Sequence, residues 1–177
     1  MSNNLKPDSK KFFIFPLTNI NLFPFTTKPL HIFEPRYRQL VHECQDEGIT
    51  FGINAFVSEN IMPLGTEMRL LNIEKHYENG EMDIRTEGVG LFEIDTYYKD
   101  AKGKLYDGAD VRTIPLKTDL VDFVMSKKIL DSVKEMFVLL NINKELPITA
   151  EEVDSFKLGH YVGFSIDQEY EIGRAHV

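Results

Sequence analysis

The chain has a single cysteine, no long uninterrupted apolar run and fewer basic than acidic residues. Cys44 alone cannot form an internal disulfide or a zinc site made of several cysteines. The longest early apolar run, Phe12 to Leu17, is interrupted by Pro16 and is shorter than the core of a secretory signal or a membrane-spanning helix. We therefore expect a reduced, cytoplasmic protein that has no membrane partner.

The charge balance limits the classes of partner. Twenty Lys and Arg residues face 28 Asp and Glu residues, which gives a formal net charge of −8. General nucleic-acid binders depend on a basic surface, so this balance argues against that class. The apolar content of 42% and the charged content of 27% are ordinary for a globular protein.

Residues 11–117 read as short strands separated by turns, after a disordered tail at residues 1–10. Turn chemistry is present at Glu78-Asn79-Gly80, at Lys102-Gly103-Lys104 and at Asp107-Gly108. The expected strands are Phe12–Leu17, Leu30–Phe33, Phe51–Val57, Thr66–Lys75, Met82–Thr86, Leu91–Tyr98 and Ala109–Ile114. Strands this short at this spacing favour a small barrel or sandwich.

Helical periodicity is found in two places. Residues 34–47 form one helix within the β-rich part, with Pro35 at its first position and Gly48 ending it. Residues 118–171 form a helical segment, in which Thr118 or Asp119 caps a helix of about 22 residues. Capping patterns at 149–152 and 165–168 predict two further helix starts.

One sequence string is specific enough to suggest a family. It consists of Pro29, Leu30, His31, Ile32, Phe33, Glu34, Pro35, Arg36 and Tyr37. From the residues alone, this string is a strand followed by a helix that starts at proline. Glu34 then caps or neutralises the helix start, and Arg36 or Arg38 pairs with a carboxylate. With Leu22-Phe23-Pro24 before it and weaker matches after it, the string resembles the opening of the N-terminal, substrate-binding (LON) domain of Lon proteases. The resemblance covers roughly residues 11–170.

The resemblance implies an α+β fold: a PUA-like β-barrel with one embedded helix, followed by a truncated helical segment. It also implies a recognition module for polypeptides, similar to the stand-alone forms of this domain found in bacteria. The nine residues of the string are then mainly structural.

The sequence indicates no catalytic, cofactor or metal site. No G-x(4)-G-K-[ST] phosphate loop occurs in it. Ser126 and Lys127 are adjacent on an expected helix, so their side chains diverge and cannot act as a protease dyad. Cys44 shares the apolar stripe of its helix, which argues against a metal site with His31 and His42. We therefore expect no enzyme activity.

The favoured function is binding of unfolded polypeptide or of a partner protein through apolar contacts. The alternative is a PUA-like module that binds RNA or a small ligand, and an unrecognised hydrolase is a third possibility. A basic groove would favour RNA, a deep polar pocket would favour a ligand or an enzyme, and a shallow apolar patch would favour peptide. We expect no nucleic-acid partner.

The last six residues, Ile172 to Val177, carry a separate signal. One reading frame of a widely used sequencing-adapter oligonucleotide encodes this same string. We therefore expect residues 172–177 to be an artefact of sequencing and exclude them from the expected fold.

Overall fold

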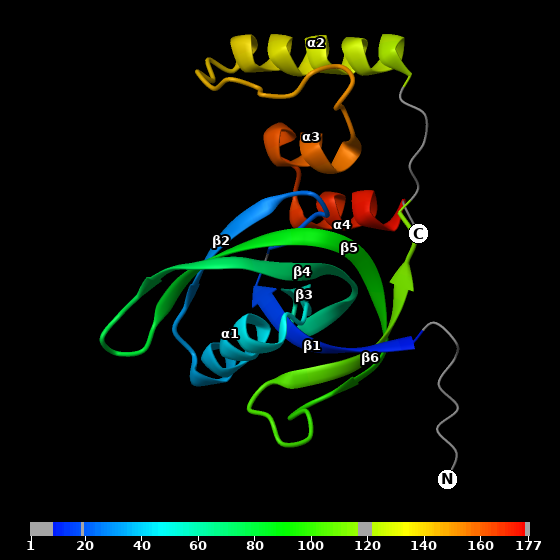
Figure 1. Cartoon of the computed structure of the whole chain (residues 1–177). Coiled ribbons are helices and arrows are strands. Elements are labelled where there is room, and N and C mark those ends of the chain that lie inside the picture. Colours follow the sequence, from blue (N-terminus) through cyan, green and yellow to red (C-terminus); the bar gives the residue numbers. More distant parts are fainter. Residues whose placement is uncertain (1–8, 19, 117–121, 176–177) are drawn as a thin grey trace. The chain divides into compact units, whose positions relative to one another are not determined.

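The computed structural model describes residues 9–18, 20–116 and 122–175. The chain divides into two compact units at about residue 116. The first unit holds the strands and one helix, and the second holds three helices (Figure 1). The α+β class expected from the sequence is confirmed.

The first unit is built on one mixed sheet. Its strands are β1 (Ser9–Thr18), β2 (Thr27–Ile32), β3 (Phe51–Val57), β4 (Asn60–His76), β5 (Met82–Tyr98) and β6 (Asp107–Ile114). Their order is β2-β5-β4-β3-β1-β6, and among these described strands only β1 and β3 pair in parallel. Because β6 also pairs with β5, five strands close into a ring, and β2 is added at the side of β5.

Most of the strand predictions agree with the structure, and β3 has the predicted bounds. Two differences have clear physical causes. The start of β4 was missed because the β3–β4 turn uses Ser58 and Glu59 at positive φ, where glycine or asparagine is the usual signal. The predicted break near Gly88 is wrong, since β5 continues through it.

Successive side chains of a strand point to opposite faces of the sheet, and each face carries its own apolar cluster. On β1, Phe12 and Ile14 belong to a cluster with Phe92, Ala109 and Val111. Phe13, Phe15 and Leu17 point to the other face, because successive side chains of a strand alternate. That face holds the larger cluster, which includes the buried side of the embedded helix.

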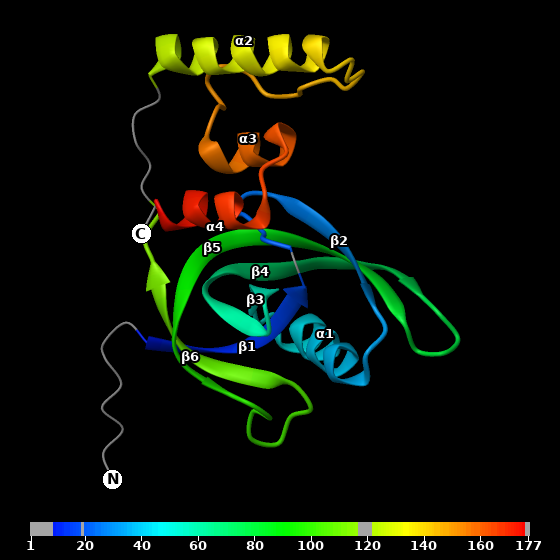
Figure 2. The ribbon, with the colours of Figure 1, turned by 180° about the vertical axis from the view of Figure 1, so that it is seen from behind.

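The embedded helix α1 (Pro35–Glu47) packs on the sheet as its periodicity predicts (Figure 2). Tyr37, Leu40, Val41 and Cys44 form its buried stripe. Gly48 ends the helix with φ of 67°, and its N–H donates to the carbonyl of Cys44. The sequence signals for this helix were therefore correct at both ends.

The second unit contains α2 (Phe123–Leu139), α3 (Ser155–Val162) and α4 (Ile166–Arg174). Asp122 caps α2 by accepting from the N–H groups of Val124 and Met125; the predicted caps Thr118 and Asp119 lie outside the described residues. None of the helices in the described ranges is long and apolar enough to span a membrane.

The capping patterns near the end of the chain had different outcomes. Ser165 and Gln168 form the predicted capping box of α4. Thr149 and Glu152 do bond to each other, but they close only a turn, and α3 begins six residues after Thr149, where Asp154 accepts from the N–H of Lys157. That predicted start was wrong.

The suspected artefact at residues 172–177 stays a prediction. Its first three residues continue α4, and Gly173 is buried.

Candidate functional site

The nine-residue string spans the end of β2 and the start of α1. Pro29, Leu30, His31 and Ile32 lie in β2, Phe33 and Glu34 form the connection, and Pro35, Arg36 and Tyr37 open α1. Glu34 holds the N-cap position but makes no side-chain capping bond. Its Oε2 accepts instead from Nε of Arg36 at 2.9 Å, which is the arginine–carboxylate pair that the sequence predicted.

The side chains of this string lie in three different environments. Ile32 and Tyr37 are buried in the larger apolar cluster. His31 is exposed and pairs with Asp83 of β5. Glu34, Arg36 and Tyr37 line a cavity, so this end of the string is the part whose side chains can contact a ligand.

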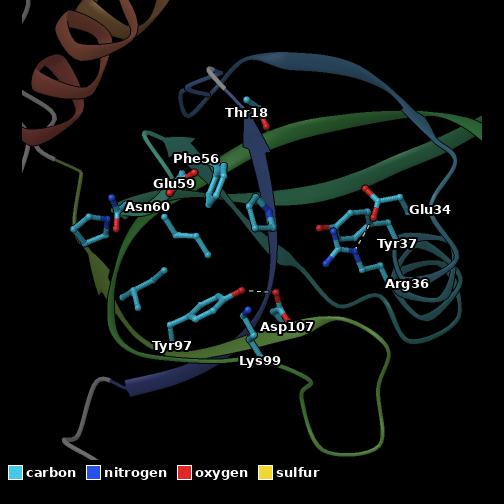
Figure 3. A pocket seen from close by; sticks show the side chains of 14 residues that line it. Thr18, Glu34, Arg36, Tyr37, Phe56, Glu59, Asn60, Tyr97, Lys99 and Asp107 are labelled. Atoms are coloured by element: carbon cyan, nitrogen blue, oxygen red, sulfur yellow. Dashed lines mark hydrogen bonds and ion pairs between the residues drawn. The ribbon is translucent and has the colours of Figure 1, made fainter.

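The cavity has a volume of about 740 Å³ and is lined by five strands and the start of α1 (Figure 3). Three lining residues point to the same face of the sheet as the cluster around Phe92, because side chains alternate along a strand: Pro16 and Thr18 of β1 and Phe56 of β3. The cavity therefore extends the interior of the strand ring. The other lining residues that sequence reasoning missed are Glu59, Asn60, Ile61, Pro63, Ile94, Tyr97, Lys99 and Asp107. They come from separate strands, so no local spacing could have predicted them together.

Two polar pairs frame the cavity. On one side, the Arg36 guanidinium carbon lies 4.6 Å from the ring centroid of Tyr37 while its Nε bonds to Glu34. On the other side, the hydroxyl of Tyr97 donates to Asp107 Oδ2. Oδ1 of Asp107 accepts from the backbone N–H of Asp100 at 3.1 Å, so both of its oxygens are occupied.

The pKa values of both tyrosines in the cavity are raised. Burial raises the pKa of Tyr37 to about 12. Burial, together with the hydrogen bond to Asp107, also raises the pKa of Tyr97. Both hydroxyls are hydrogen-bond donors at neutral pH.

The charge of the lining is mixed. Glu34, Glu59 and Asp107 supply three negative charges against the two positive charges of Arg36 and Lys99, a net of −1. This is not the basic groove that would favour RNA.

A second candidate site is an apolar groove in the helical unit, with a volume of about 730 Å³. Its apolar lining consists of Ile129, Val133, Met136, Val153, Leu158, Val162, Phe164 and Ile172. Ile129 and Phe164 are partly exposed there, so apolar surface remains in contact with water. Further exposed apolar residues are found at both ends of α2, among them Val124 and Leu139.

The residues considered for catalysis or metal binding do not come together. Ser126 is buried in α2 whereas Lys127 is exposed. Cys44 is buried in α1 and His42 is exposed, so they lie on different faces. Within the described ranges, no group of three or more His, Cys, Asp or Glu residues could hold a metal ion.

The fold of this chain is that of Lon N-terminal domains. The family model for the ATP-dependent protease La (LON) substrate-binding domain matches residues 11–162. The chain therefore belongs to the LON substrate-binding domain family.

Solved structures agree on the fold. A Lon N-terminal domain protein from Xanthomonas campestris is 21% identical, with a TM-score of 0.73 over 94% of this chain and 91% of that one. The N-terminal domain of a Mycobacterium avium complex Lon protease is 13% identical, with a TM-score of 0.61 over 93% and 90%. No curated protein matches the sequence significantly.

Proposed function

We propose that this chain is a non-catalytic module that binds unfolded polypeptide. The observation that carries the proposal is the apolar groove of the helical unit, and membership of a family described as substrate-binding supports it. The 177 residues contain no phosphate loop, which fits a binding role. The cytoplasmic location expected from the sequence stays a prediction.

The binding mechanism is burial of apolar side chains. An unfolded segment exposes aliphatic and aromatic groups that can leave water by entering the groove. Each Leu or Phe side chain that becomes fully buried contributes about 1.5–3 kcal/mol. Ordering a flexible segment opposes binding, so two or three such contacts give weak, rapidly exchanging complexes.

We propose that the strand ring is the PUA-like barrel that the family resemblance implies. Support for this assignment comes from the pairing of β6 with both β1 and β5, which leaves no open edge among the five ring strands. The closed ring provides a rigid body with an interior cavity at one end.

Two variants of the groove test the main proposal. Ile129→Ser and Phe164→Ser place a polar group in the groove, whereas Leu139→Ser changes an apolar residue of α2 that is 75% exposed and does not line it. The readout is fluorescence anisotropy of a labelled, permanently unfolded peptide rich in Leu and Phe. We expect about fivefold weaker binding for each groove variant and an unchanged affinity for Leu139→Ser.

Equal affinities for all three variants would exclude the groove as the binding site. Absence of peptide binding by the wild-type chain would end the polypeptide-binding proposal itself.

A second candidate function is binding of a small ligand, and one observation favours it. The cavity of the strand unit combines apolar walls with a few polar groups, which is typical of ligand sites.

A further inference from the structure

The hydroxyl of Tyr37 is a polar group without a hydrogen-bond partner among the described residues. The Tyr37 side chain is only 4% exposed, and its ring stacks on Phe15 with 3.8 Å between the centroids. The hydroxyl makes no hydrogen bond with any residue in the described ranges, and Figure 3 shows it pointing toward the cavity. The ring is held in the core while the hydroxyl is open to the cavity, so this group can donate to a ligand that enters there.

The neighbouring Arg36 also has unused donors. Only its Nε bonds to a residue in the described part of the chain, namely Glu34, so both terminal nitrogens of the guanidinium are free. Those nitrogens can bond a carboxylate in the two-pronged geometry that arginine favours. Lys99, which follows β5 at the cavity, forms no ion pair with the described residues and is a third donor.

Unlike these donors, most acceptors of the cavity already have hydrogen-bond partners. Both oxygens of Asp107 are occupied by Tyr97 and Asp100, and Glu34 is engaged by Arg36. Glu59, at the β3–β4 turn, is a cavity acceptor that bonds to none of the described residues, but the unused groups beside Tyr37 and Arg36 are mainly donors. A ligand that satisfies those donors must bring acceptors. The Tyr37 hydroxyl is protonated at neutral pH, as tyrosine hydroxyls ordinarily are, and burial raises its pKa further, to about 12.

The remaining walls define the rest of the ligand. Phe56, Ile61 and Ile94 face the cavity with Pro16 and Pro63, which favours an apolar group next to the anion. The net lining charge of −1 disfavours a dianion such as phosphate, because three carboxylates surround the site.

We propose that this cavity binds a single carboxylate attached to an apolar group, held by Tyr37, Arg36 and Lys99. Two sources share this chemistry: the free C-terminus of a polypeptide that ends in an apolar residue, and a small apolar carboxylic acid. The site lies in the strand unit and does not depend on the groove proposed for unfolded segments, so either proposal can fail alone.

The test uses the full chain and matched pairs of probes, followed by NMR titration or calorimetry. One pair is 4-methylpentanoate and 4-methylpentanamide; the other is a short peptide ending in leucine, with a free or an amidated C-terminus. We expect each acid that binds to bind at least about tenfold more tightly than its amide, since a hydrogen bond to a charged group contributes about 1.5–3 kcal/mol. Binding of only the peptide acid or only the small acid supports the proposal and identifies the source.

Variants then locate the site. Tyr37→Phe removes only the hydroxyl and should weaken acid binding about tenfold while leaving amide binding unchanged. Tyr77→Phe is the matched control, because the Tyr77 hydroxyl bonds to Asp83 outside the cavity. The comparison of acid with amide on the wild-type chain stands even if Tyr37→Phe does not fold.

Three results would overturn the proposal. They are equal affinity for acid and amide, acid binding that Tyr37→Phe leaves unchanged, and inorganic phosphate that binds as tightly as the carboxylate.

Discussion

The hydroxyl of Tyr106 donates a hydrogen bond to Oε2 of Glu43, across 63 residues of sequence, and so joins the residue before β6 to α1. Lys104 Nζ lies 2.7 Å from the same Glu43 oxygen, and Gln39 donates to Oε1 at 2.9 Å. The ring of Tyr106 is fully buried and packs edge-on against Phe13 at 4.8 Å. One face of the helix and the β5–β6 loop are thereby locked together.

Removal of this hydroxyl gives the first prediction. We expect Tyr106→Phe to lower the free energy of unfolding by about 1–2 kcal/mol, because Glu43 keeps its bonds from Lys104 and Gln39. Tyr98→Phe is the control, since the Tyr98 hydroxyl bonds to none of the described residues, and its effect should be below about 0.5 kcal/mol. Urea unfolding measures both, and equal values would refute the role assigned to the Tyr106–Glu43 bond.

The second prediction concerns Gly88, where β5 meets the turn before β2. A Cβ at this position would lie 2.4 Å from the carbonyl oxygen of Phe23, and the N–H of Gly88 donates to Thr26. At Gly90 of the same strand, a Cβ would meet nothing closer than Glu67 Oε2 at 3.5 Å.

Alanine should therefore have opposite effects at the two glycines. We expect Gly88→Ala to destabilise the protein by about 1–3 kcal/mol through this overlap. Gly90→Ala should be neutral or stabilise by up to about 1 kcal/mol, because alanine restricts the unfolded chain. Thermal or urea unfolding provides the readout, and a harmless Gly88→Ala would show that the turn at Phe23 shifts freely.

These glycines also show what the sequence could reveal about the fold. Pro35, Gly48, Gly80 and the Ser165 box act through local backbone chemistry, and elements they bound were correctly predicted. The predicted strands stop at Thr86 and resume at Leu91, because the role of Gly88, contact with a turn far away in sequence, has no local signature.

The candidate site was less accessible to sequence reasoning for the same kind of reason. Glu34, Arg36 and Tyr37 were noted because they lie in one distinctive string. Tyr97 and Asp107 line the same cavity only because β5 and β6 pair to close the ring. That pairing has no local signal in the sequence. The groove in turn depends on where α3 begins, and the competing cap at Asp154 was missed.

The third prediction is a pH dependence at the exposed pair of His31 and Asp83. His31 Nδ1 lies 2.7 Å from Asp83 Oδ1, and Glu81 and the hydroxyl of Tyr77 complete the cluster. The hydrogen bond to Asp83 raises the pKa of His31 above its ordinary value of 6.5, and the same bond lowers the pKa of Asp83.

The signs of these shifts define a pH window. The stabilisation from charged His31 is complete below about pH 6.5 and is lost as the pH rises through its raised pKa. The stabilisation from Asp83 is complete above about pH 4 and is lost as the pH falls through its lowered pKa. Both contributions are complete together only between these limits.

The variant His31→Gln tests this window in urea unfolding at about pH 5.5 and about pH 8. The wild-type chain should lose more stability between these pH values than His31→Gln does. His42→Gln, which changes an exposed histidine of α1, should follow the wild type. Parallel behaviour of wild type and His31→Gln would contradict the prediction.

The last prediction separates polypeptide binding from RNA binding by their dependence on salt. Apolar contacts in the groove release no counterions, so peptide affinity should change less than about threefold between about 50 mM and about 500 mM salt. Contacts to phosphate would instead lose affinity steeply over this range.

The net charge of −8 and the net charge of −1 on the cavity lining predict no RNA binding at physiological ionic strength. Anisotropy with labelled unfolded peptide and labelled single-stranded RNA measures both affinities on the same sample. Tight RNA binding that collapses at high salt, with no peptide signal, would favour the RNA-binding alternative over the apolar groove.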